Sequence, residues 1–321
     1  MQLQGRDTHM DIASTSSILR GRKDPAPSSL LNVYDQGNTL DAPKPLTAAE
    51  IKSSTDKVLR DTVTNASKML DFLHTEFGRK GLDGKGTPMD LVVHAGEPDP
   101  SSDEYGGAMT NAYWNMQTKK MYIGDSGPAA INPETGKADF GPFGRSLDVM
   151  AHEAGHAILN SEVKLKLSGQ GGALHESFGD VLGALIDPYD WQIGEDAKIN
   201  EQAKRVGFRN LSRPTVVHHM KDVQPNTEVH DLADIPNLAA VRVADELGRK
   251  NMGQIWYQGF TDFLPANANF PEAAMATVQA AEAIYGNGSR QSAAVRDAWA
   301  SVGVLEAAAK LSGLAATKKS A

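Results

Sequence analysis

The segment from Leu147 to Asp187 contains a set of residues able to bind a metal ion. His152, Glu153 and His156 form a His-Glu-x-x-His run, and Glu176 follows twenty positions after His156 (176 − 156). Residues four apart on a helix lie one turn above each other, so both imidazoles can bind one ion while Glu153 lies beside them. This arrangement is typical of a zinc site with a carboxylate base next to it.

Both parts of this set are predicted to lie on helices. Apolar residues recur at spacings of three and four in each part, as on a buried helix face. They are Leu147, Met150, Ala151, Ala154 and Ile158 in the first helix and Leu174, Phe178, Val181, Leu182 and Leu185 in the second. Ser146 is placed to cap the first helix. Glu176 and Asp180 share a different face, so we predict Glu176 as the third ligand and Asp180 as the acceptor that fixes the tautomer of a metal-bound histidine.

Metal-assisted hydrolysis is the chemistry that this ligand set favours. Two neutral imidazoles and one carboxylate leave a fourth position for water, whose pKa zinc lowers so that hydroxide is available near neutrality. Glu153 can take the proton and later pass it to the leaving group. The alternative is a solvated helix face whose histidines bind no metal, and it leaves the two carboxylates of the second helix unexplained.

The pattern HEAGH at 152–156, followed by ALHESFGD at 173–180, resembles the thermolysin-like neutral metallopeptidases of the gluzincin type. Further segments resemble that family in the same order: NVYDQGN at 32–38, FGRKGLDGKG at 77–86, TNAYWN at 110–115, MYIGDSG at 121–127, DWQIGED at 190–196, EVHDLADIPNLAA at 228–240 and QAAEAIYGNGS at 279–289. The resemblance implies a zinc endopeptidase with a two-lobed α+β fold. A mixed α/β lobe at 32–165 would end in the zinc helix, and a mainly helical lobe would follow at 166–304.

The resemblance also implies which residues bind the substrate. It places the substrate backbone on Asn111 and Ala112, because an extended peptide can pair with an edge strand; the sequence alone indicates only an ordinary strand there. Arg209 resembles the arginine that binds a substrate carbonyl, with a surface ion pair as the alternative. Three residues match the apolar pocket for the substrate residue after the cut, which predicts a preference for a bulky apolar residue: Val149, Ile193 and Phe208.

His230 resembles the histidine that hydrogen-bonds the oxyanion of the tetrahedral intermediate. Its surroundings depart from the family pattern at two positions. The aspartate expected five residues earlier is Pro225, which leaves Asp222 or Glu228 as a replacement, and a tyrosine that contacts the oxyanion is Leu167 by ungapped counting. A zinc-binding but weakly active or inactive relative that acts as a binding protein is therefore the alternative function.

Calcium is the second ion that the resemblance implies, because calcium prefers hard oxygen ligands. Asp148, Asp187, Asp190 and Glu195 match the family's calcium positions. Gln192 replaces a carboxylate there, and the connection from Asp187 to Asp190 is shorter than usual, so we expect one site at most. A cluster of solvated acids is the alternative.

Three histidines receive no role. His175 neighbours Glu176 but is expected to face elsewhere on its helix, and His218 and His219 are expected in a solvated loop.

The remaining segments complete the two lobes. Leu59 to Phe77 reads as a long amphipathic helix ended by Gly78. Asp90 to Val93 and Met121 to Ile123 read as strands of an antiparallel sheet. Four later segments carry helical periodicity: Ala239 to Leu247, Gln254 to Phe263, Pro271 to Tyr285 and Ser292 to Val302.

Composition excludes several classes of protein. With no cysteine there is no disulfide, no thiol nucleophile and no cysteine zinc finger. The net charge of −8 without a clustered basic face argues against nucleic-acid partners, and no window reaches the length of a membrane span. We expect a monomer that acts on peptide or protein substrates.

The two ends of the chain are expected to lie outside the packed lobes. Residues 1–31 are polar and read as a leader or short prosegment that is loosely ordered. They contain no apolar stretch of signal-peptide length, although the resemblance implies secretion, so another export route or retention in the cell stays open. Residues 305–321 read as a fraying tail.

Overall fold

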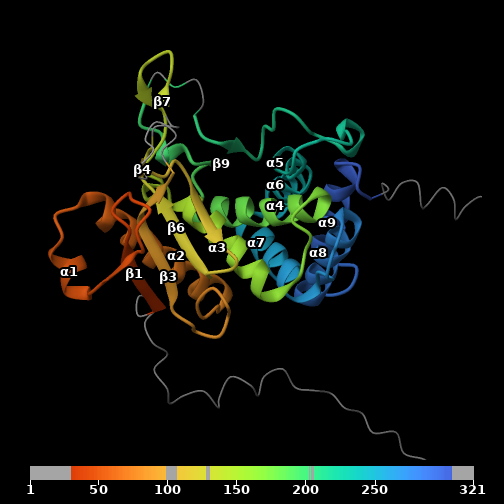
Figure 1. Cartoon of the computed structure of the whole chain (residues 1–321). Coiled ribbons are helices and arrows are strands. Elements are labelled where there is room, and N and C mark those ends of the chain that lie inside the picture. Colours follow the sequence, from red (N-terminus) through yellow and green to blue (C-terminus); the bar gives the residue numbers. More distant parts are fainter. Residues whose placement is uncertain (1–29, 99–106, 128–130, 202, 204–205, 306–321) are drawn as a thin grey trace, which may run out of the picture.

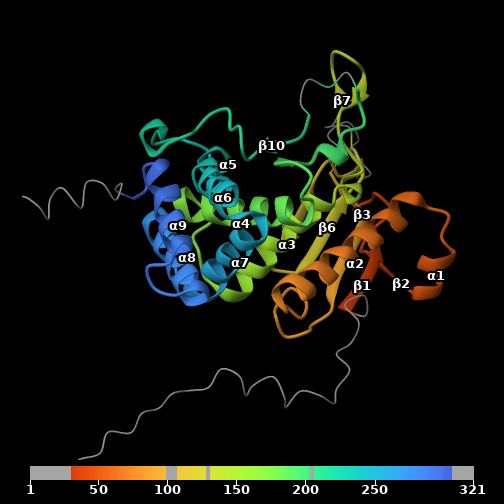
Figure 2. The ribbon, with the colours of Figure 1, turned by 180° about the vertical axis from the view of Figure 1, so that it is seen from behind.

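The computed structural model describes residues 30–98, 107–127, 131–201, 203 and 206–305 (Figure 1). A sheet with its own helix lies on one side of the molecule, a group of helices lies on the other, and two long helices run between them (Figures 1 and 2). The expected leader and tail lie outside the described residues, apart from positions 30–31 and 305.

The sheet is mixed, with the strand order β2-β1-β3-β6-β5 and with β4 paired to the end of β3. Its strands are β1 (Leu31–Asp35), β2 (Lys44–Leu46), β3 (Met89–Glu97), β4 (Gly107–Ala108), β5 (Ala112–Asn115) and β6 (Lys120–Gly124). The strands β1, β3 and β6 are parallel, whereas β2 and β5 are antiparallel to their neighbours at the two edges. The prediction of an antiparallel sheet was therefore wrong for its centre, because a helical crossover between β1 and β3 makes these two strands parallel.

That crossover contains α2 (Lys57–Phe77), preceded by the short helix α1 (Ala48–Ser53). The predicted amphipathic helix is confirmed: α2 begins after Asp56, whose carboxylate accepts hydrogen bonds from the first turn, and ends at Gly78. Gly78 has a φ of 65°, a left-handed conformation that glycine adopts without a Cβ clash.

Two helices cross between the lobes, α3 (Leu147–Glu162) and α4 (Gly169–Ile186). A Cβ atom on Gly155 would lie 2.7 Å from the Cα atom of Gly179, so the two backbones approach closely because neither residue has a side chain. Ser146 stands at the N-cap of α3 as predicted, but its hydroxyl donates to the Asp148 carboxylate and does not cap the helix. The close crossing brings the polar faces of α3 and α4 together.

The second lobe consists of α5 (Val229–Leu232), α6 (Asp234–Leu247), α7 (Arg249–Gln258), the π-helical turn η7 (Gly259–Phe263), α8 (Phe270–Tyr285) and α9 (Arg290–Ser301). The four predicted helices are confirmed, with their ends shifted by a few residues. Trp256 and Trp299 stack inside this lobe with ring centroids 5.7 Å apart. One cluster of buried apolar residues continues from the sheet through α3 and α4 into these helices.

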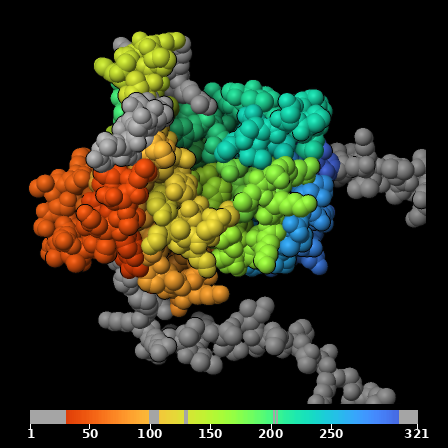
Figure 3. Space-filling view, in the orientation of Figure 1, coloured from red at the N-terminus to blue at the C-terminus, as the bar shows by residue number. Residues whose placement is uncertain are grey.

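The connection between α4 and α5 covers the upper side of the second lobe (Figure 3). It contains the two-stranded pair β9 (Gln192–Ile193) and β10 (Arg209–Asn210) and the short turns η5 (Glu195–Ala197) and η6 (Met220–Asp222). A second small hairpin, β7 (Ile131–Asn132) with β8 (Lys137–Ala138), projects from the first lobe, and η4 (Phe143–Arg145) leads into α3. None of the helices in the described ranges combines the length and the apolar character of a bilayer-spanning segment.

Candidate metal centre

The three predicted ligands converge at the crossing of α3 and α4. One ligand atom from each of His152, His156 and Glu176 lies within 4.8 Å of the others. Nε2 of His152 is 3.4 Å from Oε2 of Glu176, and Nε2 of His156 is 3.6 Å from Oε1. Tetrahedral zinc with bonds of about 2.0 to 2.1 Å separates its ligand atoms by about 3.4 Å, so the observed spacing fits that ion. In the described ranges, no other group of three histidine or acidic side chains converges in this way.

The surroundings of Glu176 also fit a bound cation. Its Oε2 atom is buried and accepts no hydrogen bond of normal geometry from the described residues, although His152 Nε2 and His230 Nε2 lie within 3.4 Å. Burial alone would raise the pKa of this carboxyl, but its contacts with His152 and His230 hold that pKa well below the usual range. A buried, ionised oxygen surrounded by nitrogens that do not donate to it is suited to share a cation with them.

Asp180 lies one turn beyond Glu176 and is completely buried. Its Oδ1 atom is 2.9 Å from Nδ1 of His152, as the sequence predicted. Arg209 donates to both carboxylate oxygens, with Nη2 at 2.6 Å and Nε at 2.9 Å, and Asn237 donates from 2.9 Å. Although burial opposes it, Arg209 and His152 hold the pKa of Asp180 below its usual range. Arg209 therefore does form the ion pair that was the alternative, but with a buried partner and not at the surface. Its contact with a substrate carbonyl stays a prediction.

Glu153 is buried beside the ligands and faces the edge strand of the sheet. Its Oε2 atom accepts a hydrogen bond of 2.9 Å from the backbone N–H of Trp114 on β5. Burial raises the pKa of Glu153 to about 7, although the charge of His152 and the hydrogen bond from Trp114 oppose that shift. A carboxyl group with a pKa near neutrality is suited to accept a proton and to return it.

His175 contacts His156, the second predicted histidine ligand, which contradicts the expectation that it faces elsewhere. Its Nδ1 atom is 3.4 Å from Nδ1 of His156, and the residue is only 3% exposed. Burial lowers the pKa of His175 to about 4. The sequence carried no signal for this contact, because it depends on how closely α4 crosses α3.

His230 lies on α5 at the border of the centre. Its Nε2 atom is 3.2 Å from Oε2 of Glu176, and its Nδ1 atom is 2.9 Å from Oε2 of Glu228. Glu228 also accepts a hydrogen bond from the backbone N–H of His230, because it is the N-cap residue of α5. Asp222 accepts from the backbone N–H of His218. Of the two replacements considered for the missing aspartate, the structure therefore places Glu228 beside His230.

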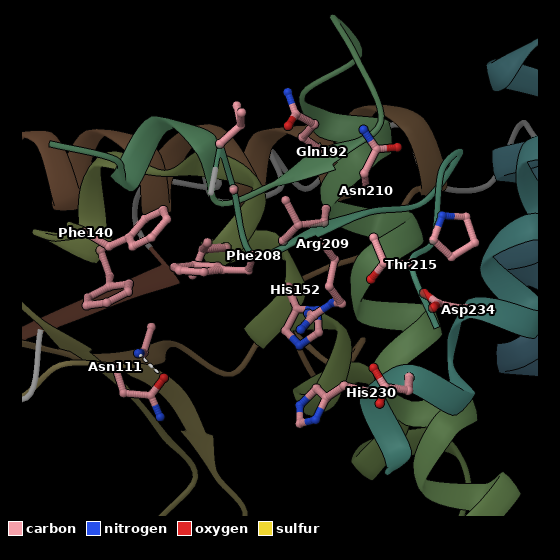
Figure 4. Close-up of a pocket in the computed structure, with 18 of the residues that line it drawn as sticks. Asn111, Phe140, His152, Gln192, Phe208, Arg209, Asn210, Thr215, His230 and Asp234 are labelled. Carbon is pink, nitrogen blue, oxygen red and sulfur yellow. Dashed lines mark hydrogen bonds between the residues drawn. The ribbon is translucent and has the colours of Figure 1, made fainter. Parts of the chain in front are cut away.

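A pocket of about 940 Å³ opens above the centre. All the residues predicted to contact substrate line it: Asn111, Ala112, Val149, Ile193, Phe208 and Arg209. In Figure 4, Asn111 and the rings of Phe140 and Phe208 lie on one side of His152, whereas His230 and Asp234 lie on the other. The Phe140 and Phe208 rings pack with centroids 4.9 Å apart. Leu167 is 59% exposed and does not line the pocket.

The four acids predicted to bind calcium do not form a converged ligand set. Among the described residues, no three of them bring carboxylate oxygens within 4.8 Å of one another. Asp148 is 1% exposed and accepts hydrogen bonds from Ser146, Val149 and Gly194. Burial and mutual repulsion raise the pKa of Asp187 and raise that of Glu195 to about 7. Calcium binding stays a prediction.

Comparisons with known proteins agree with this geometry. The thermolysin metallopeptidase family matches the chain in two parts, its catalytic domain over residues 20–160 and its alpha-helical domain over residues 163–304. The precursor of protealysin, a metalloproteinase from Serratia proteamaculans, has a similar solved structure, with a TM-score of 0.72 and 28% identity over 85% of this chain and 87% of that one.

Three curated relatives show how much of each protein is shared. Neutral protease NprE from Bacillus pumilus is 31% identical over 89% of this chain and 91% of its own length. Bacillolysin from Bacillus amyloliquefaciens is 30% identical over 94% of this chain, and Extracellular elastase from Staphylococcus epidermidis is 32% identical over 74% of it. The chain spans about half the length of these last two relatives, 56% and 45%.

Proposed function

This chain belongs to the thermolysin family of metallopeptidases, and from that membership we propose that it is a zinc-dependent endopeptidase that cleaves peptide bonds with water. One observation carries the proposal: His152, His156 and Glu176 converge within 4.8 Å of one another beside the buried carboxyl of Glu153. Of these four side chains, those of His152 and Glu153 line a pocket of about 940 Å³, which is large enough for several substrate residues.

Bound by these three ligands, zinc would lower the pKa of water and polarise the substrate carbonyl. Glu153 accepts a proton from the attacking water as the oxygen of that water bonds to the carbonyl carbon. The same carboxyl then gives the proton to the nitrogen as the C–N bond breaks, which leaves a carboxyl and an amine as products. The hydrogen bond from the backbone N–H of Trp114 holds the carboxyl of Glu153 in its orientation.

His230 is proposed to donate a hydrogen bond from Nε2 to the oxyanion of the tetrahedral intermediate. Both of its ring nitrogens face carboxylate oxygens, Glu228 at 2.9 Å and Glu176 at 3.2 Å, and the contact with Glu176 raises the pKa of His230. Glu228 would act as a positioning residue that replaces the missing aspartate. Asp180 would do the same for His152, with the proton of that ring held on Nδ1.

The substrate is proposed to bind as an added strand on β5, which has β6 on one side and forms the edge of the sheet on the other. Asn111 and Ala112 would contact its backbone, and Arg209 a carbonyl near the cut. The apolar side chains of Val149, Ile193 and Phe208 support a preference for a bulky apolar residue just after the cut. Peptides and proteins are therefore the proposed partners, and we propose secretion because one relative is named an extracellular elastase.

The test is the hydrolysis of quenched fluorescent peptides near neutral pH, with Leu, Phe, Gly or Asp after the scissile bond. Cleavage should favour Leu and Phe, stop on addition of o-phenanthroline, and return on addition of zinc. Glu153→Ala is the control. Cleavage no faster than in that variant, in a protein that still binds zinc and peptide, would favour the alternative of a binding protein with little activity. Leu167 and Pro225, which replace the tyrosine and the aspartate of the family pattern, motivate this alternative.

We also propose at most one calcium ion at Asp148, Asp187, Asp190 and Glu195. The Oε2 atom of Glu195 is buried and has no hydrogen-bond partner among the described residues, which supports a cation site there. Calcium added to zinc-loaded protein should raise its melting temperature. An unchanged melting temperature would leave the alternative of solvated acids.

A further inference from the structure

The two histidine ligands differ in what supports their outer ring nitrogens. Nδ1 of His152 lies 2.9 Å from a carboxylate oxygen of Asp180. Nδ1 of His156 lies 3.4 Å from another imidazole nitrogen, Nδ1 of His175, and the ring centroids are 5.6 Å apart. His175 is buried, and its position directly before Glu176 on α4 fixes it against α3. One helix therefore supplies a ligand and a different partner for each histidine of the other helix.

The geometry restricts where the protons of this pair can be. Nε2 of His156 faces Glu176 at 3.6 Å, so its lone pair must stay free to bind the ion and the ring must carry its hydrogen on Nδ1. Two nitrogens 3.4 Å apart leave room for one hydrogen between them. The hydrogen of His156 fills that place, so Nδ1 of His175 must present a lone pair, and the hydrogen of His175 must be on Nε2.

We propose that His175 is a positioning residue of the zinc centre: as the Nε2–H tautomer it accepts the Nδ1 proton of His156 and holds that ring with Nε2 directed at the ion. This inference rests on the proposed zinc function. It also makes the two ligands chemically unequal, because a neutral acceptor polarises an imidazole less than a carboxylate does. His156 should be the weaker electron donor and His152 the stronger one.

The first experiment measures zinc affinity by competition with a chromogenic chelator, without any assay of activity. His175→Leu should bind zinc about 10- to 100-fold more weakly than the unmodified chain, the usual loss when such a partner is removed. His175→Asn should restore affinity, because the Oδ1 atom of asparagine can occupy the place of Nδ1. Ser177→Ala is the matched control: Ser177 is buried on the same helix and its hydroxyl has no partner among the described residues.

The second experiment determines the tautomer of His175 in the zinc-loaded unmodified chain by ¹⁵N-edited NMR of the ring nitrogens. The hydrogen should be on Nε2; a hydrogen on Nδ1 would overturn the proposal, even if the leucine variant fails to fold. Equal zinc affinity in folded His175→Leu and the unmodified chain would also overturn it. Failure of the unmodified chain to bind zinc would contradict the proposed function itself. That outcome differs from a wrong tautomer of His175 and from an unchanged zinc affinity in His175→Leu, which contradict only the role of His175.

Discussion

The backbone N–H of Trp114 donates a hydrogen bond of 2.9 Å to the Oε2 atom of Glu153. Trp114 belongs to the edge strand β5, and Glu153 is the buried carboxyl next to the two predicted histidine ligands. The strand proposed to bind the substrate therefore also holds the proposed base. A shift of this strand would move the base with it.

Replacement of that base tests its role directly. Glu153→Gln preserves the size of the side chain and an oxygen for the Trp114 N–H, but it cannot accept a proton. We expect kcat to fall by about 10²- to 10⁴-fold while zinc content stays the same. Peptide hydrolysis and elemental analysis of the same preparation would check this. A variant that loses zinc as well as activity would show that Glu153 supports the metal centre and would contradict a purely catalytic role.

Asp180 is expected to affect both the metal and the fold. In Asp180→Asn the charge of Arg209 loses a fully buried counter-charge, and unfolding should become easier by about 3 to 5 kcal/mol. Zinc affinity should fall by about 10- to 100-fold, because His152 loses a carboxylate partner. Denaturant unfolding with and without a chelator separates the two effects. Asp231→Asn, which removes a carboxylate from the lining of the same pocket, is the control and should change neither quantity.

Glu228 should affect turnover more than substrate binding. The oxyanion that His230 would contact exists only after water has attacked, so loss of its positioning residue should lower kcat and leave KM nearly unchanged. For Glu228→Ala we expect a smaller loss than the about 10²- to 10³-fold typical of removing an oxyanion donor, which is the value expected for His230→Ala. Glu228→Gln keeps an acceptor for the backbone N–H of His230, so its kcat should lie between those of Glu228→Ala and the unmodified chain. Steady-state kinetics decide, and a change confined to KM would contradict the prediction.

His94 should make stability depend on pH. Its Nδ1 atom lies 2.8 Å from Asp125 and its Nε2 atom 3.1 Å from Asp56, so the contact with Asp125, supported by the charges of Asp35 and Asp56, raises its pKa in the folded chain despite burial. A raised folded-state pKa stabilises the fold fully below the unfolded value of about 6.5, and this contribution is lost as pH rises through the folded-state value.

Removal of His94 should flatten that part of the pH profile. His94→Asn suits the backbone there, because His94 has a φ of 49° and asparagine tolerates this conformation. The free energy of unfolding, measured by denaturant at several pH values, should decline above about pH 6.5 more steeply in the unmodified chain than in the variant. Parallel pH profiles for the two proteins would rule out the contact between His94 and Asp125 as the source of the pH dependence.

Gly179 should tolerate no side chain. A Cβ atom there would lie 2.7 Å from Nδ1 of His152 and 2.9 Å from its carbonyl oxygen, so either the ring or the helix must move. Gly179→Ala should destabilise the chain by about 1 to 3 kcal/mol and weaken zinc binding. Gly155→Ala meets the Gly179 backbone in the same crossing and should act in the same direction. Differential scanning calorimetry and chelator competition measure both effects, and unchanged zinc binding in Gly179→Ala would contradict the expected displacement.

The sequence was most informative where chemistry and helical periodicity coincide. The spacing of His152 and His156 predicted one helix face, and the spacing of Glu176 and Asp180 predicted a second, because such faces follow from local geometry alone. The C-terminal end of α2 was also predictable from local geometry, since Gly78 favours a left-handed terminus. Its start was expected at Leu59, whereas the helix begins at Lys57 after the Asp56 cap.

Contacts between distant segments were less predictable. The sheet was expected to be antiparallel because each strand was considered singly, whereas the crossover through α2 decides the direction of β3 relative to β1. His175 was missed because its partner is on another helix, and the choice between Asp222 and Glu228 depended on the path of the loop before α5. Periodicity reports one element at a time and contains no information on such pairs.

The two edge strands of the sheet, β2 and β5, differ in the residues that discourage pairing with another chain. Strand β2 carries Lys44 and Pro45, a charge and an imide that discourage pairing with another chain, whereas β5 reads Ala112-Tyr113-Trp114-Asn115 and carries neither. If β5 must stay open to admit its peptide, it stays equally open to unfolded copies of the same chain. Pairing of this strand with other copies of the chain should therefore lead to aggregation and to self-digestion. These two processes should limit the concentration at which the protein is stable in storage.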